Sequence, residues 1–535
     1  MKNGIFKKLK SVLCIVLATV LIGTTTACGS NNASSQQGKG TASSGDKKVV
    51  NIALSENLNT LDPLDSDNLP MDSLSKMIYD TLVESDQKGN YTPGAAESWT
   101  TSSDGLTWTF KLRKGIKYTN GEDLNADCVV TTMERLIKEP ELAIANTYWG
   151  SLGGVKKVDD YTVQITMKEK FAPMLLALSF TPIIPAKAWA QDGKKMYTEQ
   201  KCIGTGPWKF VQWVDGQYVH LVKNPDFWGK DKFNSYYDEV YLRMTSEIST
   251  AISAQLSGEV QAYINSDGIP ANMLTRYKGT ENKINLTTID SSTFYYMGFS
   301  MKESSPFYDK KVREAFEFAI DRQQLADKVL FGKGTVPNSI ICNPVVGYNP
   351  DLPKYEYNPT KAKQLLSESS YKGKKIVLYS HTNTLKAQDM LVAISAMLNS
   401  VGFNTSVQVV EPATLRDLRA TGNYDCFMVT NYCQGGDPFP VLNYRILNDG
   451  HHSMYKNPEM MSIIKQSNQE LDPKKREQLL QKFSALMREE SAPQTALVQL
   501  KLTEAVNYGL TGVEIYQNGF FSFRYVSFDK SKAKA

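Results

Sequence analysis

The sequence predicts an α/β protein with at least two packed units, because its length and its alternation of strands and helices both indicate this class. The chain has 535 residues, which is more than one hydrophobic core usually serves. Short strand patterns occupy residues 375–379 and 405–410, and the apolar residues Leu391, Ile394 and Leu398 recur between them at helical spacing, with Gly402 at the expected helix end. Such a strand–helix–strand unit is the building block of a parallel sheet.

The first 27 residues have the pattern of a secretory signal peptide. A lysine-rich start precedes an apolar run at residues 12–22, which is too short to span a bilayer. Small residues then lead to Cys28-Gly29, which resembles a bacterial lipoprotein processing site, although Thr25 stands where that pattern prefers leucine. The resemblance implies a lipoprotein signal peptide over residues 1–27 and lipidation of Cys28. Ordinary cleavage near Ala27 is the alternative.

A polar segment follows the cysteine. Residues 31–48 are nearly all Asn, Ser, Gln, Gly, Thr and Lys, so we expect a flexible tether over residues 28–48. No later segment approaches eighteen consecutive apolar residues. The sequence therefore predicts a chain that is anchored to a membrane and does not span it.

Cysteine usage does not indicate a disulfide framework. Beyond Cys14 and Cys28, five widely spaced cysteines remain: Cys128, Cys202, Cys342, Cys426 and Cys433. The last two are seven residues apart, which fits no common zinc spacing. We expect buried free thiols.

Three further elements are predicted from local patterns. Residues 161–167 alternate apolar and polar side chains, as in a half-buried strand. Asp472-Pro473 starts a helix whose apolar stripe is core packing, with Leu479, Leu480, Phe483, Leu486 and Met487 along it. A second helix is expected from Asp309 to Gly332.

The composition and the motifs exclude several functions. The chain has 60 basic and 56 acidic residues, and a net charge of +4 is too weak and dispersed to indicate a nucleic-acid partner. Motif patterns of serine hydrolases, zinc peptidases and P-loop nucleotidases do not occur. Of four histidines, His451 and His452 are adjacent and His220 lies in a strand-like run, so no metal site or cofactor is expected.

Motifs along almost the whole mature chain resemble the bacterial extracellular solute-binding proteins of oligopeptide, dipeptide and nickel ABC importers. The motifs occupy residues 59–63, 96–99, 103–118, 120–130, 204–210, 224–228, 312–322 and 437–438. The most specific is residues 103–118, in which Ser103-Asp104-Gly105 predicts a turn that feeds an alternating strand.

The resemblance implies a two-lobed α/β fold of periplasmic-binding-protein type, with a hinge and with mixed sheets flanked by helices. It implies a first lobe at residues 49–290 with an extra subdomain at about 92–202, a second lobe at 291–502, and a return to the first lobe at 503–535. Residues 204–207 are expected to form a tight connector at which the chain can change lobes. In such proteins an extended peptide lies between the lobes, bonded through its backbone, and its side chains occupy roomy, hydrated pockets with low selectivity.

The resemblance further implies that residues 431–438 contact the ligand, and that Tyr148 and Trp149 fall where the family places a cleft aromatic. A core or surface role is the alternative for these two residues and for Tyr432 in the contact segment. The candidates in the contact segment are Asn431, Tyr432, Cys433, Gln434, Gly435 and Asp437. Peptide-binding members carry an aspartate shortly before the Asp-Pro pair, which clamps the ammonium group of the ligand, and Gln434 occupies that position here. A neutral amide there costs about 1–3 kcal/mol of binding. This favours an unusual or N-blocked peptide, or a ligand that is not a peptide, while Asp437 either substitutes or is a structural loop residue.

The sequence therefore predicts a lipid-anchored substrate-binding subunit of an ABC importer on the outer face of the cytoplasmic membrane. Its partners would be a peptide or peptide-like ligand, a permease and an ATPase, and the subunit would be a monomer that is not an enzyme. Three alternatives remain open: a binding protein for a nickel chelate, a glycan or another small polar solute; a surface receptor without transport; and a secreted hydrolase, which the missing motifs disfavour.

Overall fold

One large mixed sheet runs through the protein. The computed structural model describes residues 47–66, 68–86, 89–231, 233–382, 384–443, 457–517 and 520–533. The sheet has eleven strands in the order β15-β14-β16-β12-β17-β11-β1-β10-β9-β8, with β13 paired to β17. Their bounds are β1 (Val49–Leu54), β8 (Trp208–Val214), β9 (Tyr218–Lys223), β10 (Glu239–Met244), β11 (Ala262–Ile264), β12 (Ile284–Phe299), β13 (Gly334–Thr335), β14 (Ile376–His381), β15 (Thr405–Val410), β16 (Cys426–Asn431) and β17 (Gln494–Asn507).

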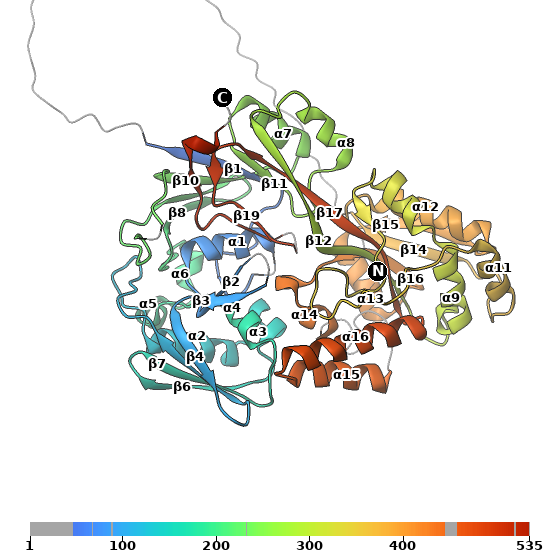
Figure 1. The fold of residues 1–535 in the computed structure, drawn as a ribbon, viewed down its shortest axis with the longest axis horizontal. Helices are drawn as coiled ribbons and strands as arrows, with labels where there is room; N and C mark the ends of the chain where they lie inside the picture. Colours follow the sequence, from blue (N-terminus) through green and yellow to red (C-terminus); the bar gives the residue numbers. More distant parts are fainter. Residues whose placement is uncertain are drawn as a thin grey trace, which may run out of the picture. The chain divides into compact units, whose positions relative to one another are not determined.

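Two long antiparallel strands connect the two ends of this sheet. β12 pairs with β17 from Ile284↔Asn507 to Gly298↔Gln494, with register shifts between Asp290 and Phe294 and between Tyr295 and Tyr296. In Figure 1 these strands lie side by side between two groups of elements. We call the elements before β12 and after β17 the first lobe, and the elements between them the second lobe.

The first lobe combines its share of the large sheet with a separate four-stranded sheet. β1 pairs in parallel with β10 and β11, and the separate sheet has the order β4-β5-β7-β6. Its strands are β4 (Ala96–Thr101), β5 (Thr107–Leu112), β6 (Leu152–Asp159) and β7 (Thr162–Met167), and β2 (Val83–Ser85) pairs with β3 (Tyr91–Pro93). The helices are α1 (Leu69–Ile78), α2 (Ala126–Lys138), α3 (Ala143–Tyr148), α4 (Met174–Ser179), α5 (Ala186–Asp192), α6 (Lys195–Thr198), α7 (Ile248–Ser257) and α8 (Ala271–Leu274). The strand expected at residues 161–167 and the turn at Gly105, which has φ +75°, are confirmed.

The second lobe contains the strand–helix–strand unit that the sequence predicted. β14 pairs in parallel with β15, and α12 (Ala387–Ser400) connects them. The other helices are α9 (Lys310–Ala319), α10 (Arg322–Gln324), α11 (Pro359–Ser367), α13 (Pro412–Thr421), α14 (Phe439–Leu442), α15 (Pro458–Gln469) and α16 (Pro473–Glu489). The Asp472 side chain accepts from the N–H groups of Lys474 and Lys475, so the predicted start of α16 is confirmed.

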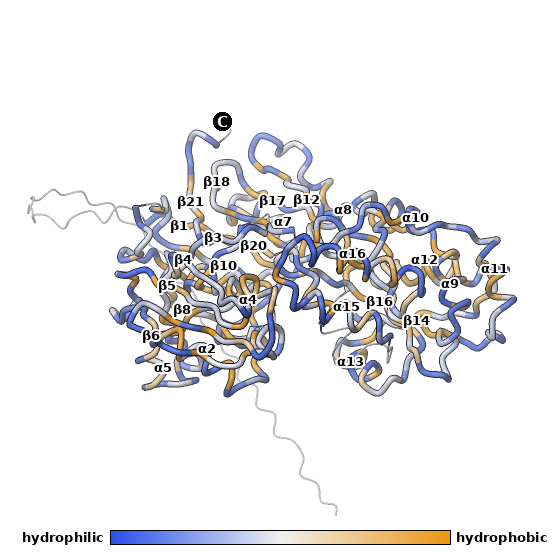
Figure 2. Tube along the Cα trace, turned by 60° about the horizontal axis from the view of Figure 1, so that its bottom comes forward, coloured by the Kyte–Doolittle hydropathy of each residue, from blue (hydrophilic) through white to orange (hydrophobic). Residues whose placement is uncertain are grey.

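Each lobe has its own hydrophobic interior (Figure 2). One cluster fills the first lobe between its part of the large sheet, α1 and the C-terminal residues, and a second lies under the four-stranded sheet. In the second lobe, one cluster lies on each face of the sheet. All five cysteines within the described residues are buried and free, as expected.

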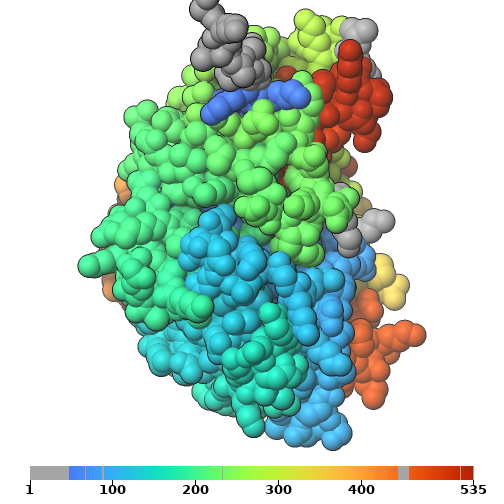
Figure 3. Space-filling view, turned by 90° about the vertical axis from the view of Figure 1, so that its left-hand side faces the viewer, coloured from blue at the N-terminus to red at the C-terminus, as the bar shows by residue number. Residues whose placement is uncertain are grey.

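The C-terminal residues pack on the first lobe. The indole N–H of Trp208 donates to the backbone oxygen of Arg524, and the Ser235 hydroxyl donates to that of Val526. Figure 3 shows this C-terminal segment, in red, beside the green surface of the first lobe. The short strands here are β18 (Leu510–Thr511), β19 (Glu514–Ile515), β20 (Phe521–Ser522) and β21 (Ser527–Phe528).

Two expectations from the sequence were wrong. The helix expected from Asp309 to Gly332 is broken, because Ile320 is extended and the Asp321 side chain caps a new helix by accepting from the Gln324 N–H. Residues 204–207 do not change lobes but lead from α6 into β8 within the first lobe. A Cβ on Gly204 would lie 2.0 Å from the Ile78 backbone oxygen, so the glycine there permits close packing on α1.

Candidate functional site

Two cavities of about 550 Å³ each lie between the lobes. We call the first the polar chamber; it is lined by Asn59, Asp65, Ser66, Asp72, Glu141, Ala143, Ile144, Asn146, Thr147, Tyr148, Asn431, Tyr432, Gln434, Pro440, Val441 and Asn443. We call the second the apolar chamber; its lining includes Tyr91, Trp108, Pro173, Leu175, Leu176, Phe180, Val346, Gly435, Gly436, Asp437, Leu471, Arg476 and Tyr516. Both lobes contribute to both linings.

The contact segment predicted from the sequence separates these chambers. It follows β16, which pairs with β12 in antiparallel fashion from Phe294↔Asn431 to Phe299↔Cys426. After the strand, the Cys433 N–H donates to the Ser292 hydroxyl oxygen (3.3 Å), which fixes the backbone of the segment to β12. The chain then makes a short 3₁₀ turn over Gln434–Gly436. Asn431, Tyr432 and Gln434 therefore face the polar chamber, while Gly435 and Asp437 face the apolar one.

Gln434 forms a bridge between the lobes. Its side-chain oxygen accepts from the Tyr148 hydroxyl (2.5 Å), and its side-chain nitrogen donates to a carboxylate oxygen of Asp72 (3.2 Å). Asp72 lies on α1 and Tyr148 ends α3, so one second-lobe amide joins two first-lobe helices. Burial raises the pKa of Tyr148 well above its usual value, and the nearby Asp72 carboxylate adds to this, so the hydroxyl stays protonated and can donate.

The two predicted aromatic residues, Tyr148 and Trp149, have different positions. Tyr148 lines the polar chamber and stacks on Phe180 at a ring distance of 6.2 Å, and Phe180 in turn lines the apolar chamber. Trp149 is buried in the first-lobe core, where its N–H donates to the Thr181 hydroxyl (3.0 Å). It borders a third cavity, which shares Asn146, Thr147, Tyr148 and Asn443 with the polar chamber, but it lines neither chamber itself. The structure thus brings Tyr148, but not Trp149, to the contact segment.

Gly435 allows the closest approach of the two lobes at the apolar chamber. It has φ +62°, and a Cβ at this position would lie 2.3 Å from a methyl group of Leu176. Glycine adopts a positive φ without strain and has no Cβ to clash with the opposite lobe, so it suits this position on both grounds.

Asp437 is held in a buried ion pair with Arg476. The Arg476 guanidinium donates two hydrogen bonds to its carboxylate, at 2.5 and 2.8 Å, and the same carboxylate accepts from the Phe439 N–H. Burial lowers the pKa of Arg476, but the attraction of Asp437 outweighs it and the pKa rises. Both side chains are buried, so this pair fixes the turn that carries Gln434 and Gly435.

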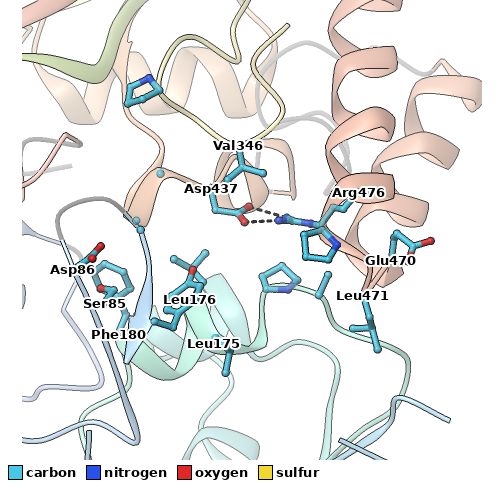
Figure 4. Close-up of a pocket in the computed structure, with 18 of the residues that line it drawn as sticks. Ser85, Asp86, Leu175, Leu176, Phe180, Val346, Asp437, Glu470, Leu471 and Arg476 are labelled. Carbon is cyan, nitrogen blue, oxygen red and sulfur yellow. Dashed lines mark hydrogen bonds and ion pairs between the residues drawn. The ribbon is translucent and has the colours of Figure 1, made fainter. Parts of the chain in front are cut away.

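The sequence did not indicate the first-lobe wall of the apolar chamber. Leu175 and Leu176 on α4 and the following Phe180 line the cavity from the first lobe, and Val346 and Leu471 line it from the second (Figure 4). In the sequence these residues look like ordinary core positions.

Lys76 lies beside three aromatic residues, two of which line the apolar chamber. Its ammonium group is 5.1–5.5 Å from the ring centroids of Phe180, Tyr516 and Phe520, and it donates no hydrogen bond within the described residues. Burial lowers its pKa to about 8, against the opposing influence of Glu84 and Glu514.

The other residues that the sequence analysis discussed either do not line the chambers or lie outside the described residues. His220 pairs with Glu239 at 3.1 Å on the large sheet. His451, His452, the signal peptide and Cys28 lie outside the described residues. Among the described residues no cluster of three or more metal-binding side chains occurs. A search of the same residues for a helix with the length and apolarity to cross a membrane found none.

The fold and the cleft define a two-lobed binding protein. The family model "Bacterial extracellular solute-binding proteins, family 5 Middle" matches residues 90–451, and the chain belongs to this family. Oligopeptide-binding protein AppA of Bacillus subtilis (strain 168) is 28% identical over 502 residues, which cover 88% of this chain and 90% of AppA. Glutathione-binding protein GsiB of Escherichia coli (strain K12) is 27% identical over 500 residues, covering 89% and 94%.

Solved structures have the same fold. AppA in complex with a nonapeptide has a TM-score of 0.74 at 23% identity and covers 90% of this chain and 100% of that chain. NikA from Brucella suis in complex with Fe(III)-EDTA has a TM-score of 0.78 at 21% identity with the same coverage. The predicted family and the predicted two-lobed α/β fold are both confirmed.

Proposed function

We propose that this chain is the lipid-anchored substrate-binding subunit of an ABC importer, which captures peptides or peptide-like solutes between its lobes. Cys28 would carry the lipid at the outer face of the cytoplasmic membrane, and residues 28–48 would be the tether. The chain would pass from the first lobe to the second at about residue 290 and return at about residue 502, as we predict from the sequence. Separate permease and ATPase chains would complete the transporter, and the ligand would be released unchanged.

The observation that carries this proposal is the Gln434 bridge with a chamber on each side of it. Each chamber has walls from both lobes, so a guest in either one contacts both lobes at once. A ligand shifts an open–closed equilibrium only through contacts that differ between the two states. The bridging hydrogen bonds to Tyr148 and Asp72 would hold the lobes together in a closed arrangement, and a ligand would add to them.

A peptide-like ligand is supported by the relatives. AppA is an oligopeptide-binding protein and GsiB a glutathione-binding protein, and both align over nearly their whole length. The second candidate is a chelate or another small polar solute, which the likeness to NikA with Fe(III)-EDTA favours. Gln434, with its neutral amide, is compatible with either class.

The test is to purify the protein under native conditions and identify any co-purifying ligand by mass spectrometry. Calorimetry with that ligand follows, on wild type, Tyr432→Ala and Gln434→Ala. We expect both variants to lose about ten- to hundredfold in affinity with little change in the stability of the ligand-free protein. Tyr357→Ala and Gln408→Ala, at exposed positions far from the chambers, are matched controls. Unchanged isotherms for both cleft variants would refute the site, and a cleaved ligand would refute the function.

The lipid anchor has a separate test. Cys28→Ser should abolish labelling by radioactive palmitate and release the protein from the membrane fraction into the medium. If the variant stays labelled or stays in the membrane fraction, the anchor proposal is wrong.

A further inference from the structure

We propose that the apolar chamber is a specificity pocket for one bulky apolar side chain of the ligand, so that the protein selects peptides that carry such a residue. The inference deepens and rests on the proposed function. It departs from the expectation of hydrated pockets with low selectivity.

The second-lobe wall of the chamber exposes apolar surface. Val346 and Leu471 are 43% and 37% exposed, and both line the cavity (Figure 4). Opposite them, Leu175, Leu176 and Phe180 form a first-lobe wall that is largely buried. An apolar guest would remove the exposed surface of the second-lobe wall from water and pack against the first-lobe wall, and burial of apolar surface is the main favourable contribution to binding in an apolar pocket.

Four charged side chains line the chamber: Asp86, Asp437, Glu470 and Arg476. The Asp86 carboxylate accepts hydrogen bonds from Asn90, and that of Glu470 accepts one from the Asp472 N–H. Asp437 and Arg476 form a bidentate ion pair in the wall (Figure 4), so neither needs a charged partner from the ligand. Lys76 does not enter the cavity lining, and its ammonium group lies against the rings of Phe180 and Tyr516, which do. The cation thus supports two aromatic walls of the chamber without making the chamber polar.

The size and the position of the chamber fit a side chain. A cavity of about 550 Å³ accommodates the largest aromatic side chains without separation of the lobes. Gln434 lines the polar chamber and the next residue, Gly435, lines the apolar one. In an extended ligand, successive side chains point to opposite sides. A ligand that lies along this turn would therefore place one side chain in each chamber.

The test uses tri-alanine and its six variants with Phe or Asp at each of the three positions, titrated by calorimetry. We expect Phe at one position to bind about ten- to hundredfold more tightly than Ala, and Asp at that position to bind no better than Ala. This preference should disappear in the double variant Val346→Asn/Leu471→Asn. Val392→Asn is the matched control, because Val392 is 50% exposed on α12 and does not line a chamber. Equal affinities for all peptides, or a preference that survives in the double variant, would overturn the proposal.

A second measurement reports on the chamber directly. Trp108 lines it, so the apolar peptide should change the tryptophan emission of wild type but not that of Trp108→Phe. N-phenyl-1-naphthylamine should bind wild type and bind the double variant at least tenfold more weakly. If the probe binds but none of the peptides does, the proposed peptide function is wrong while the apolar pocket is still supported. If the probe binds both proteins equally, the pocket assignment fails whatever the peptides do.

Discussion

The two chambers of the cleft have about the same volume but opposite chemistry. The polar chamber is closed by hydrogen bonds between the lobes, from Gln434 to Tyr148 and Asp72. In the apolar chamber the lobes meet through packing, with Gly435 against Leu176, and Asp437 pairs with Arg476 in its wall. The partition between them is the Tyr148–Phe180 stack and the turn at Gln434. The difference teaches that the two lobes of one cleft can be joined by hydrogen bonds in one part and by packing in another.

The largest effect is expected at the ion pair that shapes the apolar chamber. Arg476→Met should lower the free energy of unfolding by about 3–5 kcal/mol, because it leaves the charge of the buried Asp437 carboxylate without its ionic partner. Urea denaturation measures this loss. Asp437→Asn/Arg476→Met should recover at least half of it, since the uncompensated charge is then gone. Equal losses in the two proteins would show that the pair has no structural role.

The next effect concerns Lys76, beside the partition. Its pKa is about 8 in the folded protein, lowered by burial, against 10.5 in the unfolded chain, so the unfolded state binds more protons between these values. The stability of wild type relative to Lys76→Met should therefore rise as the pH increases from about 8 to 10.5, by on the order of 3 kcal/mol. Urea denaturation of both proteins at pH 7 and pH 10.5 measures the difference. A difference that does not depend on pH would contradict the burial of this ammonium group.

A smaller effect separates the two glycines of the turn. Gly435→Ala and Gly436→Ala both place alanine at a positive φ, of 62° and 73°, at a cost of about 1 kcal/mol in stability. Only Gly435→Ala introduces a Cβ into the Leu176 side chain, since nothing lies within 4 Å of a Cβ at Gly436. We expect a further loss of about tenfold in ligand affinity for Gly435→Ala alone, measured by calorimetry. Equal affinities for the two variants would refute the close approach of the lobes.

The smallest effect tests the polar chamber. Tyr148→Phe removes the hydroxyl that donates to Gln434 but keeps the ring that stacks on Phe180. We expect about a fivefold weaker affinity, equivalent to about 1 kcal/mol. Tyr118→Phe removes a comparable buried hydrogen bond, to the Ile183 backbone oxygen, and should reduce stability without changing affinity. Affinity that falls equally in both variants would assign the effect to general loosening.

Local signals predicted the elements that end in a strong cap or follow a clear period. The start of α16 at Asp472-Pro473 and the unit β14–α12–β15 belong to this group. The break after α9 was missed because Val312, Ala315, Phe316 and Ala319 are all apolar at helical spacing, while the cap by Asp321 depends on one side chain. Periodicity averages over several residues and does not detect a single hydrogen bond that ends a helix.

The sequence by itself determined the family, the two-lobed fold and the segment that carries Gln434, because these depend on motifs that are continuous in the chain. The tertiary structure alone decided what faces that segment. Asp72, Tyr148, Leu176 and Arg476 come from four different helices, and their distances to residues 434–437 depend on how the lobes pack. Contacts between residues so far apart in the chain leave no local pattern, so the character of each chamber appeared only in three dimensions.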